Sequence, residues 1–205
     1  MQKGVLRVSS NQRVFTVQTA YRVLEATFSS FPDFISAQRR GQVSKAFQER
    51  LMLAVTHVNN CRYCSYFHTA VSLKEGLSRE EINRLLAGEF SDAPLEESAA
   101  LMFAQHYAET LGSYDLAAYQ RIVDIYGEQT SREILAAIRM IMTGNVYGIM
   151  FDALQYRLRG RPFDGSSLGD EIGSVFGVFA FAPMILAKHT WARITGEKPA
   201  QAHSR

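Results

Sequence analysis

The feature that most constrains the fold is the spacing of apolar residues, which recur every three or four positions rather than every two. That period is typical of an α-helix with one buried face, whereas strands alternate with a period of two. Glycines stand where the apolar runs stop, as expected at helix ends, at Gly76, Gly88, Gly112, Gly127 and Gly160. The pattern therefore predicts an all-α protein without strands.

Capping residues and proline set the boundaries of the predicted helices. Two segments, Ser78 to Glu81 and Thr130 to Glu133, have the spacing of a capping box and indicate helix starts near 79 and 131. Pro94 suits the first turn of a helix that runs to Leu111. The predicted helices cover residues 14–29, 44–58, 61–75, 79–87, 95–111, 115–126 and 131–159, and an apolar helix starts at about 172.

We expect three parts along the chain: an N-terminal helical extension over residues 1–43, a core over 44–160, and an apolar helix with a tail over 161–205. Within the core, an offset of 84 residues sets 61–68 against 145–152 and Glu49 against Glu133. A tyrosine and a phenylalanine match, whereas the cysteines and a histidine do not. A duplicated helical hairpin with chemistry in only its first copy accounts for this echo, and so does chance.

Composition and charge exclude several classes of protein. Of the 205 residues, 47% are hydrophobic and 20% are charged, as in soluble globular proteins, so a disordered chain is excluded. Lysine and arginine number 22 against 20 acidic residues. With a net charge of +2 and no basic block, we expect no nucleic-acid partner.

The sequence predicts neither secretion nor membrane contact. The N-terminal residues lack the continuous apolar segment of a signal peptide. The longest apolar stretch, Ile172 to Ala187, is interrupted by two glycines and Pro183 and is shorter than the roughly 20 residues that span a bilayer. We therefore expect a cytoplasmic protein in which this stretch is buried or lies at a subunit interface.

The most informative segment contains both cysteines, Cys61 and Cys64, directly after Asn59-Asn60. The asparagines interrupt an apolar helix, and either can cap a new one, which puts both cysteines in its first turn. Backbone N–H groups and the helix dipole favour the reactive thiolate there. Cα atoms three residues apart in a helix are roughly 5 Å apart, within the range of a disulfide. The pair is therefore predicted to cycle between dithiol and disulfide.

A histidine extends the predicted site. His68 follows Cys64 by four residues, so its imidazole shares the helix face and can take the thiol proton directly or through one water. Cys64 is then expected to be the better activated thiol and to attack an oxidised substrate such as a hydroperoxide. Cys61 would resolve the sulfenic acid to a disulfide.

A zinc site is the other interpretation of these side chains, with His57 as a further ligand. On a continuous helix, His57 and His68 would lie about 16 Å apart along the axis, too far for one zinc ion. We therefore expect no metal and no other cofactor, and His57 is either a hydrogen-bonded helix residue or a group behind the thiols. Tyr63, Tyr66 and Phe67 are expected to pack around the thiols, either as core or as the wall of a substrate pocket.

The segment resembles the active-site signature of the AhpD-like alkylhydroperoxidases, within the carboxymuconolactone decarboxylase superfamily. That signature is Glu-x11-Cys-x-x-Cys-x3-His, which Glu49, Cys61, Cys64 and His68 match at every spacing. The resemblance covers residues 44–90, with looser similarity over 95–160. It implies an all-helical homo-oligomer in which 44–160 is the redox core. It also implies a thiol peroxidase that reduces organic hydroperoxides and is regenerated by a dithiol donor, either a protein or a small molecule.

Carried over residue by residue, the resemblance implies that Cys64 attacks the peroxide, that Cys61 resolves it and that His68 is the base near Cys64. Glu49 would join a water-mediated proton relay. The family's best-known members have a histidine where this chain has Tyr63, and a phenol with a pKa of about 10 cannot replace a proton shuttle at neutral pH.

This departure at Tyr63 leaves three readings open. Peroxide turnover is weaker, the proton relay is shorter, or the natural substrate is not an alkyl hydroperoxide. Two other functions also remain: a dithiol reductant of a partner protein, and a non-enzymatic redox-sensing oligomeric module.

Overall fold

The computed structural model describes residues 13–196, which contain helices and connecting turns but no strand. The predicted all-α fold class is thereby confirmed. The elements are α1 (Val17–Arg40), α2 (Lys45–Asn59), α3 (Arg62–Lys74), α4 (Arg79–Leu86), the short 3₁₀ helix η1 (Leu95–Glu97), α5 (Ser98–Glu109), α6 (Leu116–Tyr126), α7 (Glu128–Leu158) and α8 (Leu168–Thr195).

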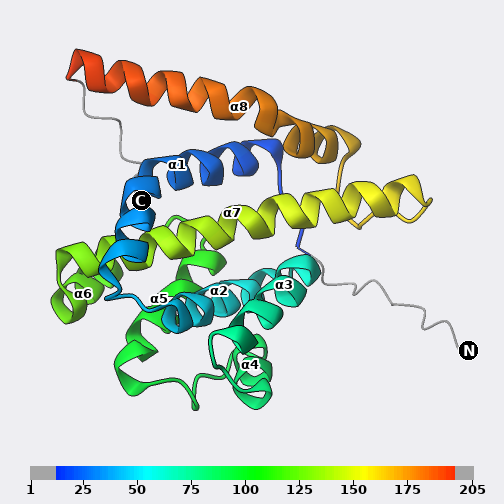
Figure 1. Cartoon of the computed structure of the whole chain (residues 1–205). Coiled ribbons are helices and arrows are strands. Elements are labelled where there is room, and N and C mark those ends of the chain that lie inside the picture. The colour runs from blue at the N-terminus through cyan, green and yellow to red at the C-terminus, as the bar shows by residue number, and fades with distance from the viewer. Residues whose placement is uncertain (1–12, 197–205) are drawn as a thin grey trace, which may run out of the picture.

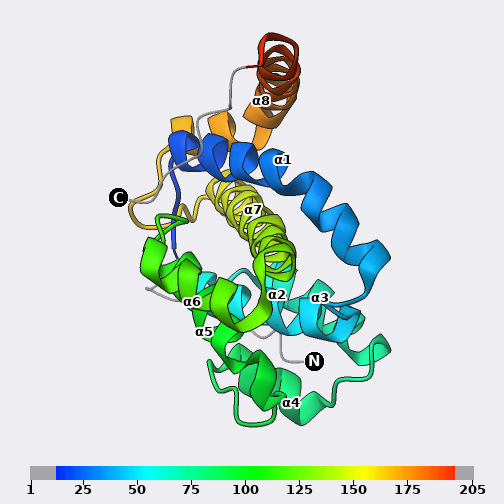
Figure 2. The ribbon, with the colours of Figure 1, turned by 90° about the vertical axis from the view of Figure 1, so that its left-hand side faces the viewer.

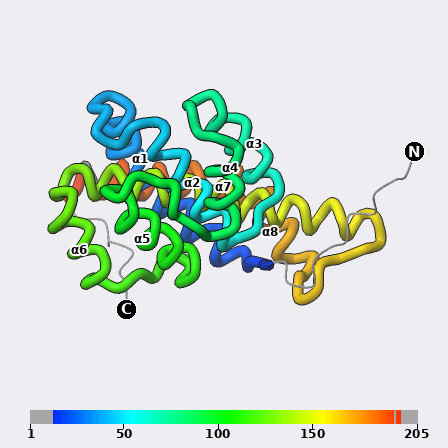
Figure 3. Tube along the Cα trace, turned by 90° about the horizontal axis from the view of Figure 1, so that it is seen from below, coloured from blue at the N-terminus to red at the C-terminus, as the bar shows by residue number. Residues whose placement is uncertain are grey.

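Helix α7 runs through the middle of the molecule (Figures 1 and 2). α1 lies along one side of α7, and α2 packs against another side together with α3 and α5. α8 turns back from the end of α7 and lies over α1. Seen from below, the turn between α7 and α8 extends beyond the other helices (Figure 3).

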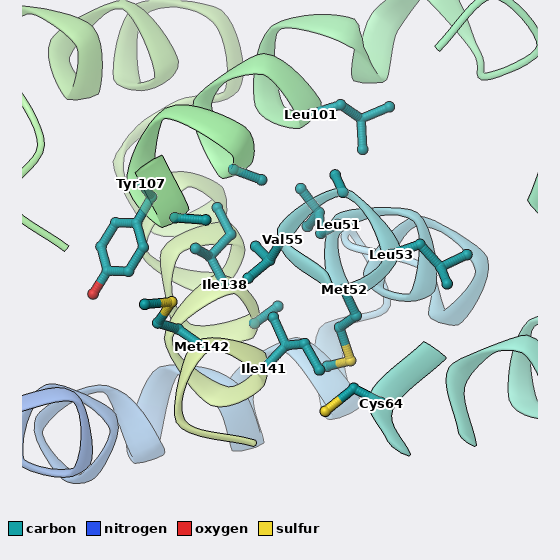
Figure 4. Packing of buried hydrophobic residues seen from close by; sticks show 14 of the residues in the cluster. Leu51, Met52, Leu53, Val55, Cys64, Leu101, Tyr107, Ile138, Ile141 and Met142 are labelled. Carbon is teal, nitrogen blue, oxygen red and sulfur yellow. The ribbon is translucent and has the colours of Figure 1, made fainter. Parts of the chain in front are cut away.

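The core lies where α2 and α5 meet α7, because each contributes fully buried aliphatic side chains. Among the largest buried side chains are Leu51, Leu53, Leu101, Ile138 and Met142. Both cysteines belong to the same cluster, and Figure 4 shows Cys64 at one edge of it. The predicted redox pair is thus held by the main hydrophobic core rather than by a surface loop.

Several predicted helix boundaries are wrong. α1 does not end at 29 but continues past Pro32 to Arg40, where Gly41 takes the left-handed conformation with φ of 69°. α7 begins at Glu128 rather than 131. The predicted capping box at Thr130 does not form, because Thr130 lies inside α7, whose N-cap is Gly127. The Ser131 hydroxyl donates to the backbone oxygens of Gly127 and Ile122, at 2.7 and 3.0 Å.

Other boundaries follow the sequence signals. Ser78 caps α4 and accepts a hydrogen bond from the Glu81 N–H at 3.0 Å, as its capping-box spacing predicts. Pro94 lies directly before η1, which leads into α5. α5 ends at Glu109, two residues before the predicted end at Leu111.

Helices α7 and α8 are both long and apolar enough to cross a membrane, but they differ in burial. The apolar window of α7 is 61% buried inside the molecule, as in the core helix of a soluble protein, whereas that of α8 is 17% buried. α8 begins at Leu168 rather than near 172, and its exposed side chains include Phe179 at 77% and Trp191 at 65%. The stretch predicted to be buried or at a subunit interface is therefore largely uncovered within one chain.

Candidate functional site

The turn between α2 and α3 presents the two cysteines. α2 ends because Asn60 takes the left-handed conformation, with φ of 57°, and its N–H donates to the Thr56 carbonyl oxygen at 2.8 Å. The next residue, Cys61, is extended, and its sulfur accepts a hydrogen bond from the Cys64 N–H at 3.3 Å. The N-cap of α3 is therefore Cys61 itself, not Asn59 or Asn60 as expected. Cys64 lies in the first turn, as predicted.

Asn59 fixes the end of α2 from inside the molecule. Its side chain is fully buried, accepts a hydrogen bond from Arg13 Nη1 at 2.9 Å and donates to Met142 Sδ at 3.2 Å. The Arg13 guanidinium also donates to the backbone oxygens of Ala108 and Glu109, at 2.8 and 3.1 Å. These contacts tie the cysteine turn to α5 and α7, which limits how far it can move.

The two cysteines are free thiols and are buried, with Cys61 at 0% and Cys64 at 9% exposure. The Cys64 thiol donates a hydrogen bond to the Cys61 sulfur, which also faces the N–H groups of Cys64 and Tyr63. These donors outweigh burial and lower the pKa of Cys61. The hydrogen bond to Cys61, followed by burial, raises the pKa of Cys64. The order of ionisation is thus the reverse of the expectation that Cys64 is the better activated thiol.

One face of α7 forms a wall beside the thiols. A Cβ placed on Gly148 would lie 3.0 Å from Cys61 Sγ and 3.6 Å from Cys64 Sγ, so this glycine lets the α7 backbone approach the pair. Asn145 and Asp152 lie on the same helix and are 0% and 5% exposed. The only signal for them in the sequence is the weak echo that sets 145–152 against the cysteine segment, and it gave no reason to place the two segments in contact.

His68 and Glu49 are brought together from α3 and α2, although 19 residues separate them. Nδ1 of His68 lies 2.9 Å from Glu49 Oε2, and the Ser72 hydroxyl donates to the same oxygen at 3.4 Å. With Glu49 as acceptor, the neutral imidazole carries its proton on Nδ1 and leaves Nε2 free as a base. No direct hydrogen bond joins His68 to Cys64 within the part of the chain described here.

Tyr63 faces Asp152 rather than the sulfur atoms. Its hydroxyl lies 3.4 Å from Asp152 Oδ1 and accepts hydrogen bonds from Arg62 Nη2 and Gln155 Nε2, at 3.0 and 3.1 Å. Its ring packs against Phe151, with ring centroids 6.2 Å apart. Asp152 also forms an ion pair with Arg62. Burial raises the pKa of Asp152, and the nearby Arg62 charge opposes that shift.

The other two aromatic residues of this segment, Tyr66 and Phe67, are exposed on α3. Tyr66 is 83% exposed and Phe67 is 62% exposed, so neither belongs to the core. Of the two alternatives for these rings, the core is therefore wrong. Phe67 packs edge-on against the His68 ring, with centroids 5.1 Å apart.

His57 lies away from the cysteines. Its Nδ1 is 2.8 Å from the Leu86 carbonyl oxygen, and a Cβ on Gly88 would lie 2.6 Å from its Nε2, so the ring is packed against the end of α4. Among residues 13–196, no group of three or more His, Cys, Asp and Glu side chains is arranged to hold a metal ion. Of the two readings of His57, the hydrogen-bonded helix residue describes the observed contacts.

Comparisons with known proteins give one match. No curated protein and no solved structure is significantly similar to this chain. Residues 25–109 match the family model described as the carboxymuconolactone decarboxylase family, and this span contains Glu49, both cysteines and His68. Over this span, from the second half of α1 to the end of α5, the chain is similar to the carboxymuconolactone decarboxylase family.

Proposed function

We propose that this protein is a thiol-dependent peroxidase that reduces organic hydroperoxides through a disulfide cycle of Cys61 and Cys64. The observation that carries the proposal is the buried thiol pair at the start of α3, in which one sulfur donates a hydrogen bond to the other. The family includes AhpD-like peroxidases, whose signature these cysteines match.

The first step starts from the singly ionised pair, in which the two sulfurs share one proton. Cys64 keeps 9% exposure and Cys61 has none, so a hydroperoxide reaches Cys64 first. When the proton lies on Cys61, the Cys64 thiolate attacks the terminal oxygen of the hydroperoxide and the O–O bond breaks. Cys64 becomes a sulfenic acid, and the leaving alkoxide takes the proton from Cys61 and departs as an alcohol.

The second step uses the lowered pKa of Cys61, which comes from its hydrogen-bond donors. The Cys61 thiolate attacks the Cys64 sulfur and the S–O bond breaks. The leaving hydroxide becomes water by taking back, from His68, the proton that left the thiol pair when it first ionised. An external dithiol then reduces the Cys61–Cys64 disulfide and becomes a disulfide itself, which restores both thiols.

We assign proton transfer at Cys64 to His68, acting through one water, because the two side chains share a helix but make no direct hydrogen bond. Glu49 holds the imidazole in one tautomer through the 2.9 Å contact at Nδ1. Tyr63 takes no part in this transfer, since its hydroxyl is engaged with Asp152 and Gln155. The relay of this protein is therefore shorter than one with a histidine between the cysteines.

The deciding experiment is the mass of the reduced protein before and after one equivalent of tert-butyl hydroperoxide at pH 7. We expect the loss of two hydrogens, mapped by peptide analysis to a Cys61–Cys64 bond and formed within seconds. Cys61→Ser should stop at the sulfenic acid, which dimedone traps, and Cys64→Ser should leave the peroxide unconsumed. If both thiols stay reduced in the parent protein, the peroxidase proposal fails.

The exposed rings of Tyr66 and Phe67 favour one second candidate, a dithiol reductant of a partner protein. They lie on the helix that starts at the thiols and give a partner an apolar surface to contact. Turnover separates the candidates: with excess dithiothreitol, a peroxidase consumes many equivalents of hydroperoxide. A protein reductant instead reduces a disulfide-bonded protein faster than it reduces peroxide.

We further propose that the protein is a homo-oligomer in which a second copy covers α8. This helix is apolar around most of its circumference, with exposed Phe176 and Phe179 on the side away from its buried Ile185. Lys188 of α8 pairs with Glu25 of α1, so this cation is already engaged and is not free to attract anionic lipid. A second copy of the chain fits this surface better than a bilayer.

A further inference from the structure

The face of α7 that meets the thiols carries a buried amide as well as a glycine. A Cβ on Gly148 would lie within 3.6 Å of both sulfur atoms, which shows how closely this turn of α7 approaches them. Residues three positions apart on a helix share one face, so Asn145 is presented toward the same pair. Asn145 is fully buried in the molecule, beyond the reach of bulk solvent.

The Asn145 side chain connects α7 with both α2 and the thiol site. Nδ2 carries two hydrogens. It donates to the Thr56 hydroxyl oxygen at 3.1 Å, and the amide also donates to the Cys64 sulfur. Oδ1 of Asn145 is buried and has no hydrogen-bond partner among residues 13–196. The amide thus contacts a reacting sulfur and keeps one acceptor unused.

We propose that Asn145 is a further catalytic residue, whose amide stabilises the Cys64 sulfur in the two forms that the cycle requires. This inference rests on the proposed function. As a thiolate, Cys64 accepts the Asn145 N–H in a charge-assisted hydrogen bond. As a sulfenic acid, Cys64 offers an O–H that the unused Oδ1 can accept. No bond to Asn145 forms or breaks, and electrons pass only between sulfur and peroxide.

A purely structural role explains these contacts less well. A buried acceptor without a partner destabilises the fold. If Asn145 only tied α7 to Thr56 of α2, its unpaired carbonyl oxygen would destabilise the protein and serve no function. An apolar pair at 56 and 145 would hold the two helices together without that cost. The missing partner of this carbonyl oxygen is explained if the group that it serves is present only during the reaction.

Alkylation tests this contact without peroxide. Cys61→Ser leaves Cys64 as the only thiol of the chain, and serine keeps the N-cap of α3. In this background the rate of alkylation by iodoacetamide is measured against pH for Asn145→Leu, Thr56→Val and the double variant. The double variant replaces both hydrogen-bond partners with apolar groups of similar shape, a change that folded proteins tolerate well.

We expect Asn145→Leu and the double variant to move the alkylation midpoint to higher pH by the same amount, and Thr56→Val to move it by less than half as much. An unchanged midpoint in Asn145→Leu, or a return to the parent midpoint in the double variant, overturns the proposal. The oxidation of Cys64 by tert-butyl hydroperoxide should slow by about tenfold to a hundredfold, as for the loss of one hydrogen bond to a charged atom.

The peroxide reaction tests the peroxidase proposal, and the alkylation profiles test the role of Asn145, so the two proposals can fail separately. If the Cys61→Ser parent does not react with peroxide at all, the peroxidase proposal fails. The alkylation profiles then still decide whether Asn145 stabilises the Cys64 thiolate.

Discussion

At the scale of single residues, Gly148 controls how closely α7 approaches the thiols. We expect Gly148→Ala to destabilise the protein by roughly 1–3 kcal/mol, because the new methyl group would overpack a buried site 3.0 Å from Cys61 Sγ. Urea unfolding of the reduced protein measures this change. The Gly148→Ala substitution should also slow disulfide formation, because the two sulfur atoms must shift to make room for the new methyl group.

Gly144, one turn earlier on α7, is the matched control. A Cβ there meets only Ile141 Cδ1 at 3.9 Å, so Gly144→Ala should stabilise the protein by up to about 1 kcal/mol through helix propensity. If both alanines stabilise the protein equally, the close approach at Gly148 does not constrain the thiols.

Asp152 is the charged group that opposes ionisation of Cys61. The hydrogen bond from Cys64 is the main influence and lowers the pKa of Cys61, whereas the Asp152 carboxylate raises it. Removing that negative charge favours the Cys61 thiolate. Asp152→Asn should therefore lower the pH at which the first of the two thiols ionises. Absorbance at 240 nm against pH measures the step.

The control for this prediction is Asp124→Asn, which makes the same change in net charge at an exposed position of α6. It should leave the thiolate step where it is. An equal shift in both variants would mean that net charge, rather than Asp152 itself, sets the pKa of Cys61.

At the scale of helices, Cys61 has a structural role as the N-cap of α3 besides its chemistry. Its sulfur accepts the Cys64 N–H at 3.3 Å. Cys61→Ala should cost about 1 kcal/mol relative to Cys61→Ser, because serine can cap the helix and alanine cannot. Chemical denaturation of the two variants under reducing conditions measures the difference. Equal stabilities would mean that a capping side chain at position 61 contributes nothing to the start of α3.

Local signals in the sequence predicted the helices and the cysteine turn, but not every end. The α4 start at Ser78 follows its capping box, whereas the similar segment at Thr130 lies inside α7 because Gly127 provides the N-cap. α1 continues past its predicted end because it packs along α7, a tertiary contact that no local pattern reveals.

The site divides in the same way between local and long-range contacts. Cys61 and Cys64 follow from spacing on one helix, and Glu49 entered the predicted site only through the family signature, as part of a water-mediated proton relay. Its direct contact with His68 comes from the packing of α2 against α3. Asn145, Gly148 and Asp152 come from α7, more than 80 residues away in the chain. Their place beside the thiols depends on how α7 packs against α3, and local spacing in the sequence contains no signal for that contact.

At the scale of the whole molecule, the half-buried Tyr147 makes stability depend on alkaline pH. Burial raises the pKa of Tyr147 to about 12. A tyrosine in the unfolded chain ionises near its ordinary pKa of about 10. The stabilisation is therefore complete below pH 10 and is lost as the pH rises toward 12, since the unfolded state releases its proton first. Urea midpoints at pH 7, 10 and 11.5 measure this loss.

Two phenylalanine variants identify the residue responsible. Tyr147→Phe should cost about 1 kcal/mol at pH 7, because its hydroxyl loses the hydrogen bond to the Ala20 carbonyl oxygen, and should flatten the alkaline decline. Tyr66→Phe changes a ring that is 83% exposed and should keep the full decline. An alkaline decline that is the same in both variants would remove Tyr147 as its cause.

The uncovered apolar surface of α8 is where we expect the copies of the chain to assemble. Burying a phenylalanine side chain contributes about 1.5–3 kcal/mol, and in a symmetric pair each substitution counts twice. Phe176→Ser with Phe179→Ser should therefore raise the dissociation constant of the oligomer by several orders of magnitude. Light scattering over a range of concentrations should give a multiple of the chain mass for the parent and the mass of one chain for the variant.

The matched control for the α8 surface is Leu95→Ser, which removes an apolar side chain that is 86% exposed on η1, and it should leave the oligomer intact. A parent that is monomeric at every concentration contradicts assembly through α8. A parent that sediments with anionic vesicles, and loses that binding in the α8 variant, would instead assign this face to lipid. The sparse positive charge of α8, whose Lys188 pairs with Glu25 of α1, argues for the second copy.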